Sequence, residues 1–113
     1  MHEFSIAENI LETIETQVGP GTRLHEVHLI VGPLSGVSAD ALEFCFTEVA
    51  QTRGLGSPTL TIDQPAARVH CLECGVHYEG RDFYEGCPEC GSLHREILTG
   101  HECTVDWVRV EED

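Results

Sequence analysis

Two Cys-x-x-Cys pairs place the strongest constraint on how this chain can fold. Cys71 and Cys74 form the first pair and Cys87 and Cys90 the second, with twelve residues between the pairs and a glycine directly after each. Two intervening residues let both thiolates of one tight turn reach the same ion, and two such turns complete a tetrahedron with Zn–S distances of about 2.3 Å. The glycines permit the positive φ that brings the backbone close to the sulfur atoms. The sequence therefore predicts a structural zinc on these four cysteines, with no coordination position left open for catalysis.

Two other chemistries fit the same spacing. A rubredoxin-like iron site would use the same four thiolates, and sequence alone separates the two metals poorly. Redox-active pairs are the second alternative, but a dithiol oxidoreductase normally has one such pair at the start of a helix. Here glycine and loop-like sequence follow both pairs. We therefore favour zinc and expect the folding of residues 69–98 to depend on the metal.

The remaining cysteines and the nearby histidines are interpreted separately from the zinc ligands. Cys45 falls in an apolar helical stripe and Cys103 begins a strand, so both are expected to be small buried hydrophobic residues. His70, His77 and His94 flank the zinc turns. They are either exposed polar side chains or groups that sense pH and replace thiols as the thiols become protonated.

The charge balance excludes several classes of partner. There are 20 acidic residues against 6 arginines and no lysine, which gives a net charge of -14. A nucleic-acid binder needs a cationic surface to displace counterions from phosphate, so no nucleic acid and no anionic membrane surface is expected as a partner. The acidic surface serves solubility, or suits a protein that meets cations or basic partners.

Length and segment composition indicate a small intracellular protein. A chain of 113 residues accommodates one domain, or one small domain with a metal-stabilised module. No run approaches the ~20 apolar residues of a membrane span. The first residues contain neither a basic region nor an apolar run, so no signal peptide is predicted. Because the cysteines also follow metal spacing more than a disulfide framework, we expect a cytoplasmic location.

Two helices are predicted before the cysteine region. Ser5 and Glu8 form an S-x-x-E capping box, which predicts a helix that starts after Ser5 and ends at Gly19-Pro20-Gly21. Ser38 is the expected N-cap of a second helix, with Asp40 in its first turn, where a negative charge suits the helix dipole. The apolar residues at helical spacing are Ile6, Ile10, Leu11, Ile14 and Val18 in the first helix, and Leu42, Cys45, Phe46 and Val49 in the second.

Three strands are predicted, at about 23–31, 59–63 and 103–110. The first is expected to turn His25, Val27, Leu29 and Val31 to one face, and the last to alternate Val105 and Trp107 against Val108 and Val110. The order of elements indicates an α+β fold, in which a small three-stranded sheet and two helices carry an inserted zinc-ribbon-like module with four cysteines. The expected domains are 1–66 with 101–113, and the zinc-binding segment 67–100.

The first residues of the chain offer a second kind of metal chemistry. The α-amine of Met1, the amide nitrogen of His2 and the imidazole of His2 can bind one ion as neighbouring nitrogens. Tetragonal nitrogen and oxygen ligation suits Ni(II) or Cu(II). Since the amide must lose its proton, this binding is expected to weaken at low pH.

Several segments together resemble the HypA/HybF family. The start Met1-His2-Glu3-Phe4-Ser5-Ile6 resembles the family's M-H-E-x-S opening. Residues 30–37 and 41–46 are similar to its G-x-L-S-x-V…A-L-x-F-x-F stretch. The cysteine module and the closing Gly100-His101-Glu102…Val105 also match in order and position. The resemblance covers essentially the whole chain.

The resemblance implies a nickel chaperone for [NiFe] hydrogenase. Members of the family pass Ni(II) to the hydrogenase large subunit precursor, working with the GTPase HypB, and some also serve urease. By this resemblance His2 is the nickel ligand, with Met1 and Glu3 beside it, and Asp40 stands where some members supply an oxygen to nickel. The implied zinc ligands are the four paired cysteines. A monomer or weak homodimer is expected.

Two other functions compete with nickel transfer. One is a zinc-ribbon interaction module without a nickel role, for which His2 and Glu3 would be incidental. The other is an enzyme. The sequence has no nucleophile–base motif, no phosphate-binding loop and no open position among the paired cysteines, so no enzymatic activity is expected.

Overall fold

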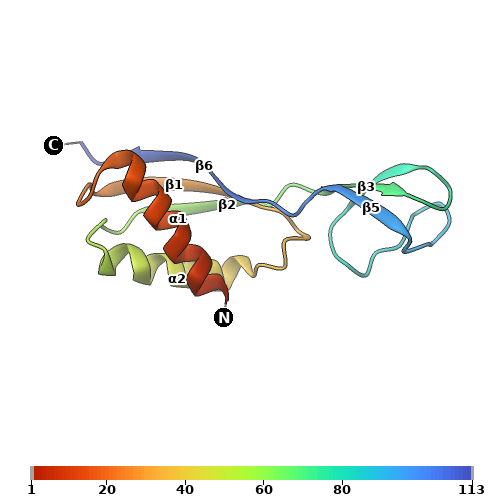
Figure 1. Ribbon diagram of the computed structural model, residues 1–113, viewed down its shortest axis with the longest axis horizontal. Coiled ribbons are helices and arrows are strands. Elements are labelled where there is room, and N and C mark those ends of the chain that lie inside the picture. The colour runs from red at the N-terminus through yellow and green to blue at the C-terminus, as the bar shows by residue number, and fades with distance from the viewer. Residues whose placement is uncertain (1, 113) are drawn as a thin grey trace.

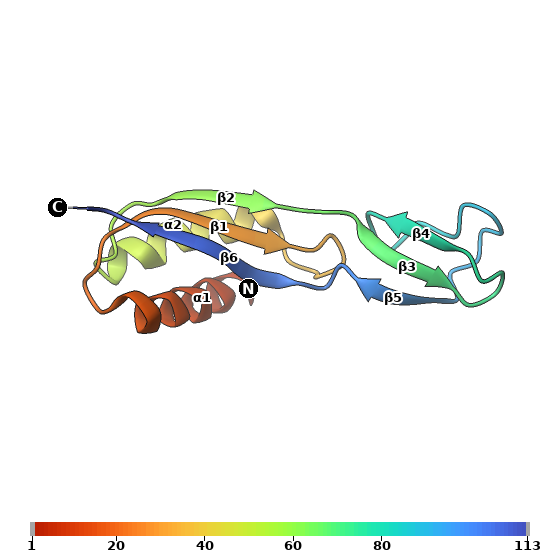
Figure 2. The same ribbon diagram turned by 90° about the horizontal axis from the view of Figure 1, so that it is seen from above.

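The computed structural model describes residues 2–112. The elements in chain order are α1 (His2–Val18), β1 (Leu24–Val31), α2 (Ala39–Thr52), β2 (Thr59–Asp63), β3 (Ala67–Cys71), β4 (His77–Gly80), β5 (Arg95–Thr99) and β6 (Cys103–Val110). The strands form two three-stranded sheets, ordered β2-β1-β6 and β4-β3-β5. The sheets follow one another along a molecule of 56 × 25 × 19 Å (Figures 1 and 2). The predicted α+β class, with a three-stranded sheet, two helices and a cysteine module, is confirmed.

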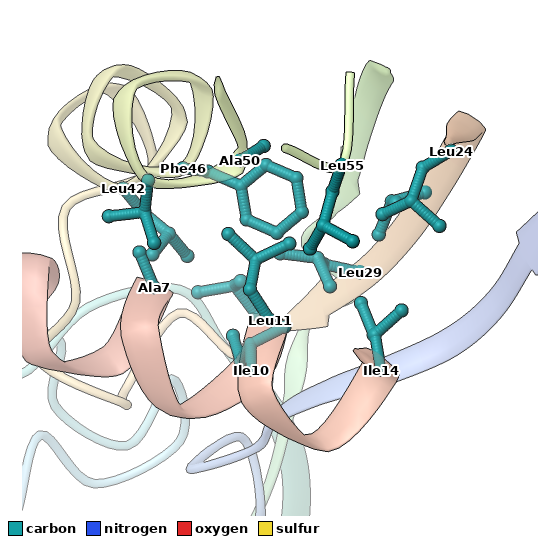
Figure 3. Close-up of a cluster of buried hydrophobic side chains, with 13 residues drawn as sticks. Ala7, Ile10, Leu11, Ile14, Leu24, Leu29, Leu42, Phe46, Ala50 and Leu55 are labelled. Atoms are coloured by element: carbon teal, nitrogen blue, oxygen red, sulfur yellow. The ribbon is translucent and has the colours of Figure 1, made fainter. Parts of the chain in front are cut away.

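Both helices pack on one face of the first sheet, and the opposite face carries no helix (Figure 2). In this sheet β2 runs parallel to β1 and β6 runs antiparallel to it. The apolar stripes of the helices meet the inner face of β1 in a single core (Figure 3). The buried members of this core are Ala7, Ile10, Leu11, Ile14, Leu24, Val27, Leu29, Val31, Leu42, Phe46, Val49, Ala50 and Leu55.

The first helix begins earlier than the sequence predicts. It starts at His2, so the interpretation of Ser5 and Glu8 as a capping box is wrong, and both residues lie inside the helix. The physical reason is a contact from outside the segment. The carboxylate of Glu3 accepts a hydrogen bond from the backbone N–H of Ser38 at 3.0 Å, which ties the first turn of α1 to the start of α2. The predicted end is confirmed, because Gly19 follows the helix with a φ of 97°.

The second helix follows its sequence signals. Ser38 has extended backbone angles, and its hydroxyl accepts a hydrogen bond from the N–H of Ala41 at 3.3 Å. Asp40 lies in the first turn, as predicted. Of the expected stripe, Cys45 is only half-buried, and Ala50 takes a fully buried position instead.

Two β-bulges change which residues of β1 and β6 face the core. At the first, the pairing moves from Leu24–Val110 to Glu26–Arg109, so β1 has an extra residue and exposed His25 leaves the predicted inner face. At the second, the pairing moves from His28–Trp107 to Leu29–Val105, so β6 has the extra residue. Because a bulge reverses the alternation of side chains beyond it, the predicted faces are wrong at these points. Val105 and Val108 pack together on the core, whereas Trp107 faces outward.

The second sheet was not predicted from the sequence. Strands β4 and β5 both pair antiparallel with β3, and the turns that carry the cysteines connect them. The apolar core of this sheet has only three buried members, Leu34, Ala67 and Val69, with Tyr78 and Ile97 packed beside them. So few apolar residues leave no clear periodicity in the sequence.

The first and second sheets are joined by close backbone contacts. The N–H of Gly32 donates to the carbonyl of Glu102 at 2.7 Å, and the N–H of Leu34 donates to the carbonyl of Gly100 at 2.9 Å. A Cβ atom on Gly32 would lie 2.1 Å from the Gly100 oxygen, so only glycine fits there. Leu34 belongs to the loop that follows β1, yet it is buried in the core of the second sheet.

Candidate metal sites

The two cysteine turns have the same backbone hydrogen bonds. In the first turn the N–H of Gly75 donates to the Cys71 carbonyl at 3.0 Å, and the N–H of Cys71 donates to the Val76 carbonyl at 2.9 Å. In the second turn the N–H groups of Gly91 and Cys87 make the corresponding bonds, at 2.8 and 3.0 Å. Both glycines have the positive φ predicted from the sequence, 83° and 76°. Each turn buries its first cysteine and exposes its second.

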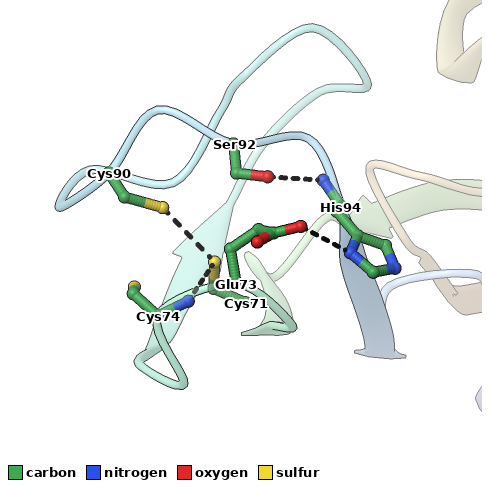
Figure 4. Close-up of polar contacts among 6 residues, drawn as sticks. All are labelled: Cys71, Glu73, Cys74, Cys90, Ser92 and His94. Carbon is green, nitrogen blue, oxygen red and sulfur yellow. Dashed lines mark hydrogen bonds and ion pairs between the residues drawn. The ribbon is translucent and has the colours of Figure 1, made fainter.

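The four predicted zinc ligands converge. All four Sγ atoms lie within 4.8 Å of one another, and the Cys71–Cys90 and Cys74–Cys87 sulfur pairs are each 3.6 Å apart (the first is drawn in Figure 4). A tetrahedron with Zn–S distances of about 2.3 Å has sulfur atoms about 3.8 Å apart, close to these separations. A disulfide would need about 2.05 Å. The cluster therefore suits a structural zinc held by thiolates alone.

Backbone N–H groups near the cluster act to lower the pKa values of its thiols. The N–H of Cys74 points at the Cys71 sulfur at 3.5 Å; this contact, helped by the Glu73 amide and the neighbouring thiols, outweighs desolvation and lowers the pKa of Cys71 to about 6. At Cys90 the Ser92 amide acts to lower the pKa, but desolvation and the neighbouring thiols outweigh it and raise the pKa to about 12. The four thiols therefore do not all ionise at neutral pH without a cation, and metal binding must release protons.

The residues around the cluster divide between its two sides. His94 Nδ1 lies 2.9 Å from a carboxylate oxygen of Glu73, a contact between the two turns that the sequence did not indicate (Figure 4). His70 and Cys71 are successive residues of β3 and so point to opposite faces of the sheet. Cys45 and Cys103 are half-buried beside the main core, away from the cluster, in line with their interpretation as small hydrophobic residues.

Of the predicted nickel residues, His2 and Glu3 lie at the start of α1 and Asp40 at the start of α2, while Met1 is outside the described residues. The His2 imidazole is exposed, with its Nε2 3.5 Å from a Glu3 carboxylate oxygen. His2 is the first residue of the helix, and the first four N–H groups of a helix have no carbonyl partner within it. Its amide nitrogen is therefore not held by the helix ladder and is chemically suited to lose its proton to a metal.

Glu3 and Asp40 have different surroundings. The side chain of Glu3 is 12% exposed, and the Ser38 amide, helped by the backbone N–H of Glu3 and by His2, lowers the pKa of its carboxyl to about 2. Asp40 is exposed in the first turn of α2, two residues beyond Ser38. The Glu3–Ser38 contact joins residues 35 positions apart, so no local pattern could have revealed it.

Four converging cysteine side chains on a small sheet, attached to an α+β unit, define a metal-binding protein. The family model described as "Hydrogenase/urease nickel incorporation, metallochaperone, hypA" matches residues 1–110. The chain therefore belongs to the HypA family.

Relatives and solved structures agree with this membership. Over its whole length the chain is 34% identical to "Hydrogenase maturation factor HypA" of Chlorobium luteolum, covering 98% of that protein. It is 36% identical to the protein of the same name from Geobacter metallireducens, over 98% of this chain and 100% of the relative. The fold is similar to the solution structure of the Ni metallochaperone HypA from Helicobacter pylori, with a TM-score of 0.66 and 17% identity over both whole chains. Within residues 2–112, neither helix is long and apolar enough to span a bilayer.

Proposed function

We propose that this protein is a nickel metallochaperone that binds Ni(II) at its N-terminus and delivers it for the maturation of [NiFe] hydrogenase. The observation that carries the proposal is the family match over residues 1–110, since that family is described by nickel incorporation. The relatives reported above are both named as hydrogenase maturation factors. The family description also names urease, but hydrogenase is the client proposed here.

The proposed sites separate a retained ion from an exchanged one. Zinc is assigned to Cys71, Cys74, Cys87 and Cys90, whose sulfur spacing supports a closed tetrahedral cage. Nickel is assigned to the His2 imidazole and amide with the amine of Met1. Glu3 is assigned a positioning role, because its carboxylate already accepts the Ser38 N–H. Asp40 is assigned as an oxygen donor by resemblance only.

The exposed terminal site fits delivery better than the cage does. A chaperone must hold its cargo firmly enough to select it and loosely enough to release it. The exposed His2 leaves the ion accessible to a receiving protein, and protonation of the amide nitrogen provides a route to release. Selectivity cannot come from affinity alone, since Cu(II) outranks Ni(II) at nitrogen sites. Handover between specific partners supplies the selectivity.

The partners, location and organisation are proposed from the resemblance. They are the GTPase HypB as co-chaperone, the hydrogenase large subunit precursor as acceptor, the cytoplasm as location, and a monomer or weak homodimer as the working form. Residues 1–66 with 101–113 form the proposed nickel-binding domain, and 67–100 the zinc-binding domain. No catalytic role is proposed, and the comparisons lend no support to a zinc-ribbon interaction module without nickel.

Nickel titration on protein with its native first residue tests the proposal. His2→Ala should abolish tight nickel binding and leave zinc at the parent level, and a single glycine added before Met1 should do the same by displacing the amine. The matched control is His25→Ala, which removes an exposed histidine from β1 and should leave nickel binding unchanged. Nickel affinity equal to the parent in His2→Ala would contradict the terminal site.

A further inference from the structure

Three side chains of types that can ligate metals, two histidines and one glutamate, form one row across the outer face of the second sheet. His77 of β4 pairs with His70 of β3, and His70 pairs in turn with Glu96 of β5. The neighbouring positions Val69 and Cys71 are buried on the other face, so the row faces away from the thiolate cluster. None of the three residues is used by the zinc or nickel sites described above.

The distances within the row are short. The imidazole rings of His70 and His77 are stacked, with centroids 4.4 Å apart and planes 9° from parallel. His70 Nδ1 lies 3.9 Å from Glu96 Oε1, too far for a hydrogen bond. Two ligand atoms at about 2.1 Å from one ion and at right angles are about 3.0 Å apart. Neighbouring members of the row are therefore close together, but the three ligand atoms do not converge: among the described residues, only the four paired cysteines bring three or more ligand atoms within 4.8 Å of one another. A bound ion would require the three side chains of the row to move closer.

The side chains are free to close that gap. His77 is exposed, the Glu96 side chain is 61% exposed, and the His70 side chain is 31% exposed. To bind one ion above His70, the central member of the row, the His77 ring would have to tilt and Glu96 would have to change rotamer. Arg68 is the cationic residue of β3 nearest to the row. It pairs with Glu79 of β4, so a carboxylate lies opposite its positive charge.

We propose that His70, His77 and Glu96 form a second, weaker site for a divalent first-row transition ion. Two imidazoles and one carboxylate suit Ni(II), Cu(II) or Zn(II), and water would complete the coordination. Because the ligands are exposed and must reorient, the ion exchanges readily, unlike one caged by four thiolates. The site is independent of the N-terminus and would hold metal in a chain whose terminal site had been removed.

The test uses the zinc-loaded full chain carrying His2→Ala and one glycine before Met1, titrated with nickel sulfate alone. Calorimetry should detect residual nickel binding. Paramagnetic broadening in NMR spectra should centre on residues 70, 77 and 96. His77→Gln in this background should weaken the binding by at least about tenfold, because even an outer partner of a metal ligand is worth that much.

The matched control is His94→Gln, which removes an exposed histidine of the same module whose ring contacts Glu73 and not a member of the row. It should leave the residual affinity within about twofold of the background, and zinc content should remain at the parent level in both variants. Residual binding that is absent, that is insensitive to His77→Gln, or that broadens residues around His94 instead would overturn the proposal. Because the terminal site is absent throughout, none of these results bears on the proposed nickel delivery.

Discussion

At the scale of single residues, Glu3 links the proposed nickel site to the fold. Its carboxylate lies within 3.5 Å of the His2 imidazole and accepts the Ser38 N–H at 3.0 Å. The acidic group also lies in the first turn of α1, where it interacts favourably with the helix dipole. A residue expected as a neighbour of nickel therefore has a structural task, which is to hold the start of α1 against the start of α2.

Glu3→Gln should lower stability in a way that depends on pH. The folded pKa of Glu3 is about 2, below its usual value of 4.5, so the ionised carboxylate stabilises the folded state at neutral pH. This contribution is fully present above pH 4.5 and is lost as the pH falls from 4.5 to 2. Thermal unfolding of parent and variant should show a lower melting temperature for the variant at pH 7 and a difference that narrows below pH 4.5. A constant difference between pH 7 and pH 3 would contradict this role.

The candidate site divides into residues that the sequence reveals and residues that it does not. The paired cysteines could be identified because their ligand geometry depends on local spacing. The Glu73–His94 contact and the His70–His77 stack could not, because they depend on the register of strands that the metal module itself creates. His2 stood out only as part of a terminal nitrogen pattern.

At the scale of elements, local signals succeeded where local contacts decide the structure. Ser38 was predicted as an N-cap because its hydroxyl serves an amide three residues away. The start of α1 was missed because it depends on a partner in another segment. The predicted face of β1 was right for Val27, Leu29 and Val31 but wrong for His25 at the bulge, and in β6 the bulge separates Trp107 from Val105. An inserted residue leaves no mark in the apolar pattern.

The strands of the second sheet depend on the cysteine cluster. With Leu34, Ala67 and Val69 as its buried apolar members, this sheet has too little apolar area to fold well by itself. Cys74→Ala should therefore release zinc and unfold residues 67–99, while β1, β2 and α2 remain folded. Elemental analysis and amide NMR spectra measure both effects.

The control for that variant is Cys45→Ala, which removes a half-buried cysteine from α2. It should keep the zinc content of the parent and cost about 1 kcal/mol or less, since it removes one small side chain of partial burial. If Cys74→Ala kept its zinc and the amide signals of β3 to β5, the cluster would not be the support of the second sheet.

At the scale of the whole molecule, the chain joins two separate apolar cores by short-range contacts. The loop after β1 supplies Leu34 to the small core, and the same loop leads to Ser38, which meets Glu3. Gly32 and Gly100 allow the backbones to approach where larger residues would collide. The arrangement of the two sheets along the long axis in Figure 2 therefore depends on one loop as well as on the strand connections.

Leu34→Ala should loosen this arrangement without removing either metal site. Leu34 is 2% exposed, and the loss of a buried leucine side chain costs about 2–5 kcal/mol. Because the small core has so few members, the neighbouring Ala67 and Val69 cannot refill the space. Zinc should stay bound, since the thiolates are untouched, while the second sheet reorients more freely relative to the first. In the parent, residual dipolar couplings of β1 and β3 should fit a single alignment tensor, whereas in Leu34→Ala they should not.

The control is Leu98→Ala, which removes an exposed leucine from β5 and should leave both stability and alignment unchanged. A Leu34→Ala variant with the parent's alignment and a loss below about 1 kcal/mol would mean that the strand connections alone fix the two sheets, since 1 kcal/mol is well under the cost of a buried leucine.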